Sequence, residues 1–390
     1  MEDDLPEELV ALIMAQLPKH AVGVAARTCN RWYRCSPVHL RNRLSVKYLC
    51  GRLALLQWAV GNGLVPNHET CAAAAGQGQL DVLQWLRLEQ ACHWDRQTAL
   101  AAAEGGHLLV LKWAVEYGCP WQERQVATVL AKQGHLEGLK WMRQRPDWKI
   151  AFLYFVMDFA AFHGHLHVVQ WARLQQGCNW TERTCAYAAE NGHLEVLQWA
   201  RERGCPWDQW TCHNAARNGH LEVLRWARNN KCAWNNVTCK MAASNGQLEV
   251  LKWARENGCP WDSLDICTHG ARSGHVETLK WLREQGCPWD SWTCAAAAEN
   301  GHLELLQWAR ENGCPWDEQT CSGAAEQGNL KVLKWAHENG CPWDESTCER
   351  AALAGQLEVL KWLRAHGCPW NPDTLCCGSD EVYQWVQENK

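Results

Sequence analysis

From residue 51 onward, one pattern of hydrophobic and polar positions repeats along the chain. It is clearest in DSWTCAAAAENGHLELLQWARENGCPW, which runs from Asp290 to Trp316. A short Ala-rich segment comes first and ends at Asn300 and Gly301, a pair suited to a turn through positive φ. Apolar residues then recur at spacings of two to four as far as Ala309, which predicts an amphipathic helix. Each copy therefore predicts two short helices joined by a tight turn.

The ends of these helices are also marked in the sequence. Thr293 is placed to cap the first helix, and Gly313 with Pro315 ends the second. Helices of two or three turns are unstable alone in water, so each copy must bury its apolar side against the next one. The pattern predicts an all-α fold: a curved solenoid of about twelve helix-turn-helix copies.

Composition supports a copied unit, because the chain has 27 Trp and 23 Cys but only 4 Phe. One Trp position recurs from Trp58 to Trp362 at intervals of 27 or 28 residues, with a single interval of 30 between Trp141 and Trp171. A second Trp follows each copy in the sequence CPW or a variant of it. A residue type that fills one position of a repeated unit is multiplied with the unit.

The order T-C-x-x-A-A-x-x-G-H-L-E-V-L-x-W-A-R-x-x-G-C-P-W resembles the ankyrin repeat over about residues 51–378. Cys294 stands where that family has Pro, and Trp308 stands at a core Leu position. The copies are about six residues shorter than the 33 of the family. The resemblance implies that the projecting hairpin is reduced to a tight loop, as in short variants abundant in large DNA viruses and protists.

Residues 5–32, LPEELVALIMAQLPKHAVGVAARTCNRW, do not follow the repeat. Their aliphatic residues sit four apart on one side of a predicted helix. The segment resembles an F-box, and the resemblance implies docking on the Skp adaptor of a cullin-type ubiquitin ligase. The matching positions that would bind the adaptor are Leu5, Pro6, Leu9, Ile13, Leu17, Pro18 and Trp32. The alternative is a plain cap over the first repeat, which every solenoid needs.

These patterns divide the chain into three parts. We expect an F-box-like helical domain at residues 1–45, an ankyrin-like array at 46–378 and a C-terminal capping helix at 379–390. One copy is irregular, because it holds all four Phe of the chain, from Phe152 to Phe162, at spacings of three and four. Such a stripe is usually core, so we expect it to fill a gap inside an irregular joint. An aromatic docking pocket is the alternative.

No candidate for catalysis or metal binding emerges from the Cys and His residues. Cysteines recur seven residues apart, as at Cys205 and Cys212, whereas zinc sites need closer clusters. We expect free thiols that pack as small hydrophobes, and turn histidines that bond to carbonyl groups. The run from His163 to His167 is expected to bind no metal. With no catalytic motif, we expect a protein that is not an enzyme and has no cofactor.

Charge and hydropathy exclude other partners. A net charge of −5 without basic clusters argues against nucleic acid, and no run of about 18 apolar residues could span a membrane. The acidic N-terminus MEDDLPEE lacks the basic region, the apolar region and the small-residue cleavage site of a signal peptide. We expect a monomer in the cytoplasm or nucleus, or in the host cytoplasm if the protein is viral.

Function is expected where the copies differ, because packing constrains the other positions. Two positions vary most, one just before the Thr and one just after the first Cys of each copy. In the ankyrin family the matching positions line the concave face that grips targets. The candidate target-binding residues are Tyr187, Trp210, His213, Asn214, Lys240, Met241, Thr268, His269, Trp292, Glu349 and Arg350. Neutral drift at a solvated surface is the alternative.

The sequence thus predicts a protein-binding repeat protein, the substrate receptor of a cullin-type (SCF) ubiquitin ligase. It would dock the Skp adaptor through the F-box and an unknown target through the concave face. The second hypothesis is a scaffold or decoy without a link to ubiquitin, in which the N-terminal segment is only a cap.

Overall fold

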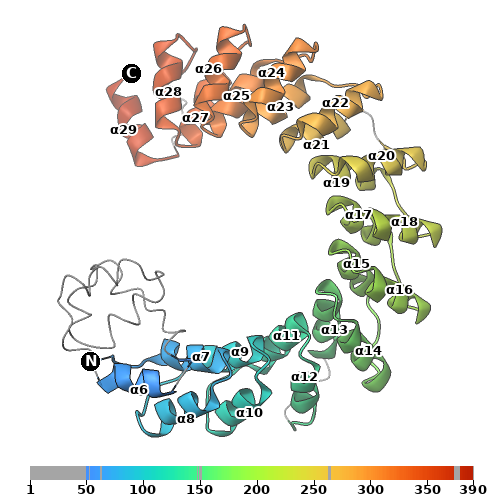
Figure 1. Ribbon diagram of the computed structural model, residues 1–390. Helices are drawn as coiled ribbons and strands as arrows, with labels where there is room; N and C mark the ends of the chain where they lie inside the picture. The colour runs from blue at the N-terminus through green and yellow to red at the C-terminus, as the bar shows by residue number, and fades with distance from the viewer. Residues whose placement is uncertain are drawn as a thin grey trace, which may run out of the picture. The chain divides into compact units, whose positions relative to one another are not determined.

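The structure is a computed structural model that describes residues 50–51, 53–61, 64–146, 148, 152–261, 265–372 and 378–389. In these ranges every regular element is a helix and none is a strand (Figure 1). The chain divides into two compact units, residues 1–179 and residues 180–390. The prediction of an all-α solenoid built from helix pairs is confirmed.

The first unit contains helix pairs in which a first helix is followed by a second one across a glycine turn. Helix α6 (Leu53–Gly61) precedes the complete pairs. The pairs are α7 (His68–Gly76) with α8 (Leu80–Leu88), α9 (Arg96–Glu104) with α10 (Leu108–Glu116), α11 (Glu123–Gln133) with α12 (Leu136–Arg143), and α13 (Phe152–Phe162) with α14 (Leu166–Gln170), which continues as the π-helix η1 (Trp171–Gln175).

The second unit repeats this arrangement. Its pairs are α15 (Glu182–Glu190) with α16 (Leu194–Glu202), α17 (Gln209–Arg217) with α18 (Leu221–Asn229), α19 (Asn236–Ser244) with α20 (Leu248–Glu256), α21 (Asp265–Arg272) with α22 (Val276–Glu284), α23 (Ser291–Glu299) with α24 (Leu303–Glu311), α25 (Glu318–Glu326) with α26 (Leu330–Glu338), and α27 (Glu345–Leu353) with α28 (Leu357–Ala365); α29 (Asp380–Glu388) follows.

The first helix of each pair begins one turn earlier than predicted. Asp208 caps α17, because its Oδ1 accepts a hydrogen bond of 3.0 Å from the backbone N–H of Trp210. Asp317 caps α25 in the same way. Thr293, predicted as a cap, is instead the third residue of α23 and is fully buried. That prediction is wrong, because α23 already begins after Asp290, whose backbone carbonyl accepts from the Thr293 N–H, and this start places the Thr293 side chain in the interior.

The turn between the helices of a pair depends on glycine and on the next copy. Gly192 has φ +76°, and a Cβ placed on it would lie 2.7 Å from the His220 ring. The His220 Nε2 lies 3.1 Å from the backbone oxygen of Glu190. His302 bonds the Arg272 carbonyl in the same way, at 3.1 Å. The prediction that these histidines bond to carbonyl groups near the turn is confirmed, and each bond joins successive copies.

Thiols fill the space between the first helix and the loop that ends the pair. All cysteines of the described ranges are free and buried. Cys71 and Cys92 contact at 3.4 Å between their sulfurs. Later copies repeat this contact between positions 20 residues apart: Cys185 with Cys205, Cys212 with Cys232, Cys239 with Cys259, Cys267 with Cys287, Cys294 with Cys314, Cys321 with Cys341 and Cys348 with Cys368. The seven-residue spacing seen in the sequence, as between Cys205 and Cys212, does not identify these partners, because each of these thiols contacts the one 20 residues away.

The buried thiols make stability sensitive to alkali. Burial raises the pKa of Cys119 and of Cys178 to about 11, from an ordinary value of 9.0. The unfolded thiols therefore ionise first, so the stabilising effect is complete below about pH 9 and is lost as the pH rises to about 11. We expect the urea midpoint to fall across this window, and to fall less in Cys119→Ala. A midpoint that is unchanged up to pH 11 would contradict the burial of these groups.

Contacts between Arg and Trp side chains link successive copies near the short loop that joins them. The Arg310 guanidinium lies 4.0 Å from the ring centre of Trp316 and donates to the Cys314 carbonyl. Trp316 in turn meets Trp335 edge to face at 5.9 Å. Aromatic pairs contribute about 0.5–1.5 kcal/mol and cation–π contacts about 0.5–1 kcal/mol. The same arrangement recurs at Arg201 with Trp207, Arg228 with Trp234, Arg255 with Trp261 and Arg283 with Trp289.

The aromatic stripe of α13 does not fill the core. The side chains that α13 buries are those of Leu153, Val156, Met157, Ala160 and Ala161. Phe155 is 39 % exposed, and Phe159 and Phe162 are half-buried. The prediction of core packing is therefore wrong for these three side chains. The helix is apolar on most of its sides, and the smaller aliphatic residues take the positions that Thr, Cys and Ala occupy in the other copies.

Candidate protein-binding surface

The first helices of the second unit line one side of it. Figure 1 shows α15, α17, α19, α21, α23, α25 and α27 side by side along the inner edge of this unit, with the second helices along the outer edge. Each first helix buries its Cys and the Ala residues near its end, together with a Thr or, in α21, Ile266 at the matching position. The positions that vary between copies lie on its other sides. We call the side chains at these positions in α15–α27 the inner surface.

The predicted residues differ in how far they reach solvent. Trp210 and Trp292 are 52 % and 60 % exposed. His213 is 2 % exposed. The half-buried members of the set are Tyr187, Asn214, Lys240, Met241, Thr268, His269, Glu349 and Arg350. The two indoles are therefore the largest apolar groups that the inner surface offers to a partner.

His213 supports the inner surface from beneath. Its Nε2 lies 2.9 Å from the Oδ1 of Asn235, the residue that caps the next first helix. Burial lowers the pKa of His213, so the ring is neutral at ordinary pH. The ring of Trp210 stands edge-on to it at 5.4 Å. His213 thus positions Trp210 and has almost no surface of its own for a partner.

Polar contacts from two side chains, Lys240 and Asn214, tie neighbouring first helices together across the inner surface. Lys240 Nζ lies 2.9 Å from Asp265 Oδ2 and holds the pKa of that carboxyl below its ordinary value. Asn214 Nδ2 donates to the Ala186 carbonyl and to Glu190 Oε2, at 3.3 Å each. Exposed ion pairs contribute about 0–1 kcal/mol, so these contacts orient side chains more than they stabilise the fold.

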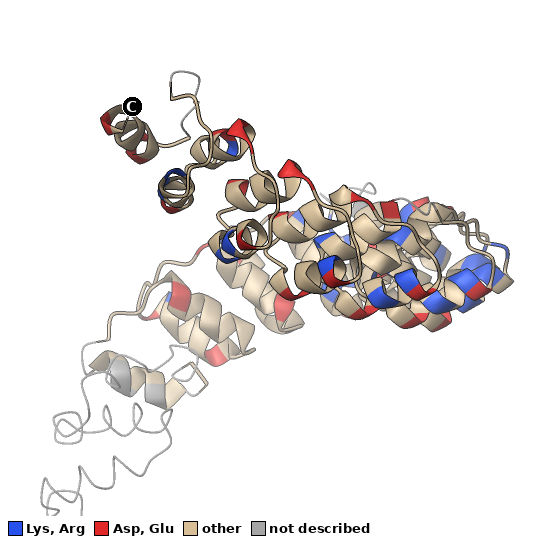
Figure 2. Ribbon diagram, turned by 90° about the horizontal axis from the view of Figure 1, so that it is seen from above, with Lys and Arg blue, Asp and Glu red and all other residues tan. Residues whose placement is uncertain are grey.

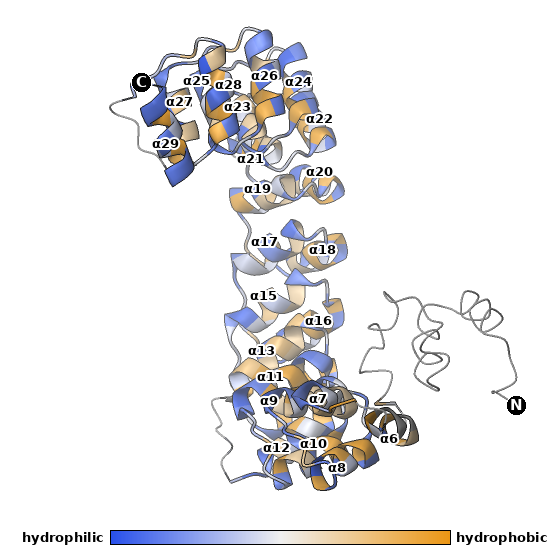
Figure 3. Ribbon diagram, turned by 90° about the vertical axis from the view of Figure 1, so that its left-hand side faces the viewer, coloured by the Kyte–Doolittle hydropathy of each residue, from blue (hydrophilic) through white to orange (hydrophobic). Residues whose placement is uncertain are grey.

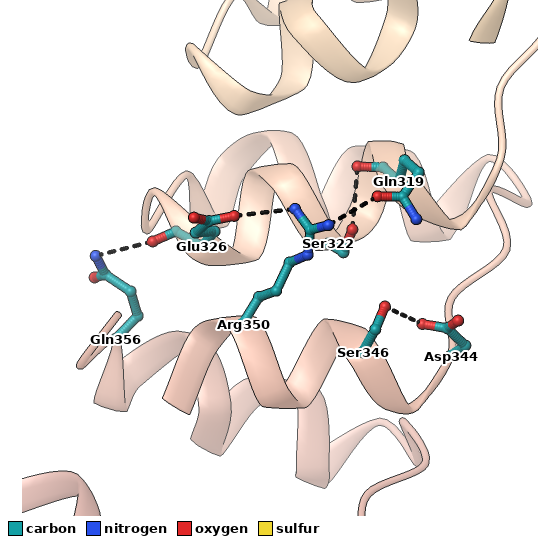
Figure 4. Close-up of polar contacts among 7 residues, drawn as sticks. All are labelled: Gln319, Ser322, Glu326, Asp344, Ser346, Arg350 and Gln356. Carbon is teal, nitrogen blue, oxygen red and sulfur yellow. Dashed lines mark hydrogen bonds and ion pairs between the residues drawn. The ribbon is translucent and has the colours of Figure 1, made fainter. Parts of the chain in front are cut away.

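Arg350 bridges α27 and α25 (Figure 4). Its Nη1 lies 3.1 Å from Glu326 Oε2, and its Nη2 donates to Gln319 Oε1 at 3.0 Å. The guanidinium is held by two partners, yet its side chain stays 42 % exposed. Because two partners hold this planar guanidinium group, its remaining N–H groups are oriented to donate to a carboxylate or carbonyl group of a partner protein.

A hollow of about 80 Å³ lies beside this bridge. Ala295, Ala296 and Gly323 are buried at its base, and the exposed indole of Trp292 is one of its walls. The other lining residues are Thr268, Arg272, Glu299, Gln319 and Arg350. In α17 the positions of Ala295 and Ala296 hold the larger residues His213 and Asn214, and the His213 ring lies 5.4 Å from that of Trp210. The hollow lies beside Trp292, where both positions are alanine.

Gly323 is a part of this surface that the sequence pattern did not predict. It lies inside α25 without positive φ, and a Cβ built on it would meet the Glu299 Cβ at 3.4 Å, an ordinary contact. Glycine in a helix interior costs about 0.5–1 kcal/mol relative to alanine. The backbone does not require glycine here, and its effect is to keep the hollow open. A glycine within an otherwise Ala-rich helical segment was the available signal.

Charge is mixed over the described helices. In Figure 2 acidic and basic residues lie interleaved along the ribbon, and in Figure 3 the helices carry both hydrophobic and hydrophilic sides. Second helices hold short ion pairs three residues apart, as between Lys252 and Glu249 at 2.9 Å. Among the described residues, no group of three or more His, Cys, Asp or Glu side chains is placed to hold a metal ion. None of the described helices is long and apolar enough to cross a membrane.

Comparisons with known families agree with both resemblances. Residues 3–39 match the F-box domain, and residues 185–228, 239–291 and 324–364 match ankyrin repeats in many copies. The chain is an F-box protein with ankyrin repeats. The crystal structure of the human ASB11 ankyrin repeat domain is similar to this F-box protein over 48 % of this chain and 99 % of that one, at 17 % identity and a TM-score of 0.38. A search of curated proteins found no match to this F-box protein.

The predicted adaptor-binding residues of the F-box protein, Leu5 to Trp32, lie outside the described residues. Their assignment therefore stays a prediction. The inner surface is described, and it brings together Trp292, Thr268 and Arg350 at the hollow, whereas Tyr187 and Trp210 lie on other first helices.

Proposed function

We propose that this F-box protein is the substrate receptor of a cullin-type ubiquitin ligase, and a binding protein rather than an enzyme. The observation that carries the proposal is the match of residues 3–39 to the F-box domain, in one chain with repeats whose inner surface varies from copy to copy. F-box domains and ankyrin repeats are both protein-interaction modules. One part would bind the Skp-type adaptor and the other a target protein.

The adaptor half of the proposal can be tested with purified components. The full chain, co-expressed with a Skp-type adaptor, is expected to elute from gel filtration as a single complex that contains both proteins. Separate elution at micromolar concentrations would contradict the proposal.

The target half rests on the chemistry of the inner surface. A few residues carry most of the binding energy in protein interfaces, and these are enriched in Trp, Arg and Tyr, the types of Trp292, Arg350 and Tyr187. The hollow beside Trp292 can take an apolar side chain of a partner. Arg350, already oriented by Glu326 and Gln319, can bond a polar group beside it.

A matched pair of tryptophans tests this site. We expect Trp292→Ala to weaken target binding by about tenfold or more, as for an aromatic anchor, and Trp210→Ala to weaken it less. The reason is that the hollow lies beside Trp292, whereas the larger residues His213 and Asn214 stand at the matching positions near Trp210. Binding is measured as the amount of each cellular protein that the tagged chain retains, by quantitative mass spectrometry.

Gly323 supplies the control for that experiment. Gly323→Leu fills the hollow and should reduce the same proteins as Trp292→Ala. Gly323→Ala adds only a Cβ at ordinary contact distance and should retain them. Equal retention by the wild type, Trp292→Ala and Gly323→Leu would show that the target binds elsewhere.

A further inference from the structure

The Phe stripe of α13, formed by Phe155, Phe159 and Phe162, lies in the first unit and outside the inner surface defined above. The chain has 4 Phe in all, and three of them are these residues. Counted from the glycine of the turn, Phe155 and Phe159 stand at the positions of Trp210 and Asn214, and Phe162 stands at that of Arg217. The stripe thus occupies the positions that vary in the second unit, but fills them with apolar side chains.

Two cations from the neighbouring helix α11 lie over the rings of this stripe. The Arg124 guanidinium carbon is 4.3 Å from the ring centre of Phe155, and Lys132 Nζ is 5.0 Å from that of Phe159. Arg124 and Lys132 are both exposed. Neither forms an ion pair with a carboxylate among the described residues. The side chains of α11 and α13 therefore form an apolar surface that carries two positive charges.

Two acidic groups lie close to these cations. Glu123 precedes Arg124 on α11, and Asp158 lies on α13 between two residues of the Phe stripe; each has an interaction of its own. The formal charges of the four residues sum to zero, but in the described part of the chain neither acid forms an ion pair with Arg124 or Lys132. A cation beside an aromatic ring attracts a carboxylate while the ring offers apolar contact area. The chemistry complementary to this surface is an acidic segment that also carries aliphatic or aromatic residues.

We propose that the Phe stripe, with Arg124 and Lys132, is a second binding site, which takes an acidic and apolar peptide segment of a partner protein. The apolar side chains of the segment lie against Phe155 and Phe159. Its carboxylates pair with the guanidinium of Arg124 and the ammonium of Lys132. This site goes beyond the proposed function, because it lies outside the helices to which the target was assigned.

The test selects peptides from a random 12-residue phage library against the full-length chain. We expect the selected peptides to combine Asp or Glu with aliphatic or aromatic residues. A synthetic copy of the most enriched peptide should lose about tenfold or more in affinity for Phe155→Ser/Phe159→Ser, as when aromatic anchors are truncated. Arg124→Glu/Lys132→Glu should cause a similar loss, and that loss should shrink at high salt, which screens exposed charges.

Two controls distinguish peptide binding at the Phe stripe from general effects of substitution and of unfolding. Leu109→Ser changes a side chain that is 73 % exposed on the second helix α10, and it should leave peptide affinity unchanged. Melting curves of all variants show whether they are folded. Equal affinity of the peptide for the wild type and both double variants would overturn the inference. Loss of affinity in Trp292→Ala alone would also overturn it, by placing the peptide on the inner surface, and would leave the proposed function standing.

Discussion

A chain that carries Leu9→Asp and Leu17→Asp is expected to recover no Skp-type adaptor. Leu5, Leu9, Ile13 and Leu17 are spaced four apart, so in a helix they share one side, which the F-box resemblance assigns to the adaptor interface. Burying an unpaired carboxylate in an apolar interface costs several kcal/mol, and each 1.4 kcal/mol is a factor of about ten in affinity. Two such carboxylates should reduce adaptor binding by more than a thousandfold.

Ala11→Asp is the matched control, because helical spacing would place residue 11 on the side opposite Leu9 and Ile13. It adds the same charge and should leave adaptor recovery unchanged, as should far-UV circular dichroism in all three proteins. Recovery that survives Leu9→Asp/Leu17→Asp would contradict the F-box assignment. Deleting residues 1–35 addresses the cap hypothesis: an F-box can be removed without lowering the melting temperature of the repeats, whereas a cap cannot.

Replacing Leu306 by Ala is expected to destabilise the second unit by about 3 kcal/mol, within the range for buried leucines. Leu306 is fully buried in α24. Trp308→Ala should cost less, about 2 kcal/mol, because Trp308 is only half-buried and its main partner is Trp289, edge to face at 5.7 Å. In this copy we therefore expect the tryptophan to stabilise the array less than the leucine, although the tryptophan is the more prominent of the two in the sequence.

The measurement is urea unfolding of the full chain, followed by circular dichroism and by hydrogen exchange in α23–α26. Hydrogen exchange is needed because a repeat array can unfold one section at a time. Glu304→Ala, at an exposed position of the same helix, should stay within about 0.5 kcal/mol of the wild type. A larger loss for Trp308→Ala than for Leu306→Ala would contradict the packing described above.

The helix pairs could be predicted from the sequence because glycine, proline and apolar spacing act locally. Gly301 and Gly313 mark the turns that the structure has, and His302 bonds a carbonyl as expected. Helix starts were predicted one turn late, since both Asp and Thr are good caps and only tertiary packing decides that Thr293 is buried. Periodicity shows which residues share a side of a helix, but not which side is buried.

The same limit explains the errors at the candidate sites. The spacing of Phe155, Phe159 and Phe162 was recognised, yet α13 buries its smaller aliphatic side chains instead. His213 varies between copies like a surface residue, but a hydrogen bond to Asn235 holds it in the interior. The hollow beside Trp292 depends on the space that four successive first helices, α21, α23, α25 and α27, leave empty. Apart from the glycine at residue 323, single positions in the sequence carry no signal for a space of that kind.

The central claim is that one chain holds an adaptor and a target at separate places. Affinity capture from cells, with quantification of every recovered protein, tests this claim most directly. Leu9→Asp/Leu17→Asp should lose the adaptor and retain the target, whereas Trp292→Ala/Arg350→Glu should retain the adaptor and lose the target. If either variant loses both partners together while its melting curve is unchanged, or if neither loses any, the account of two independent binding sites is contradicted.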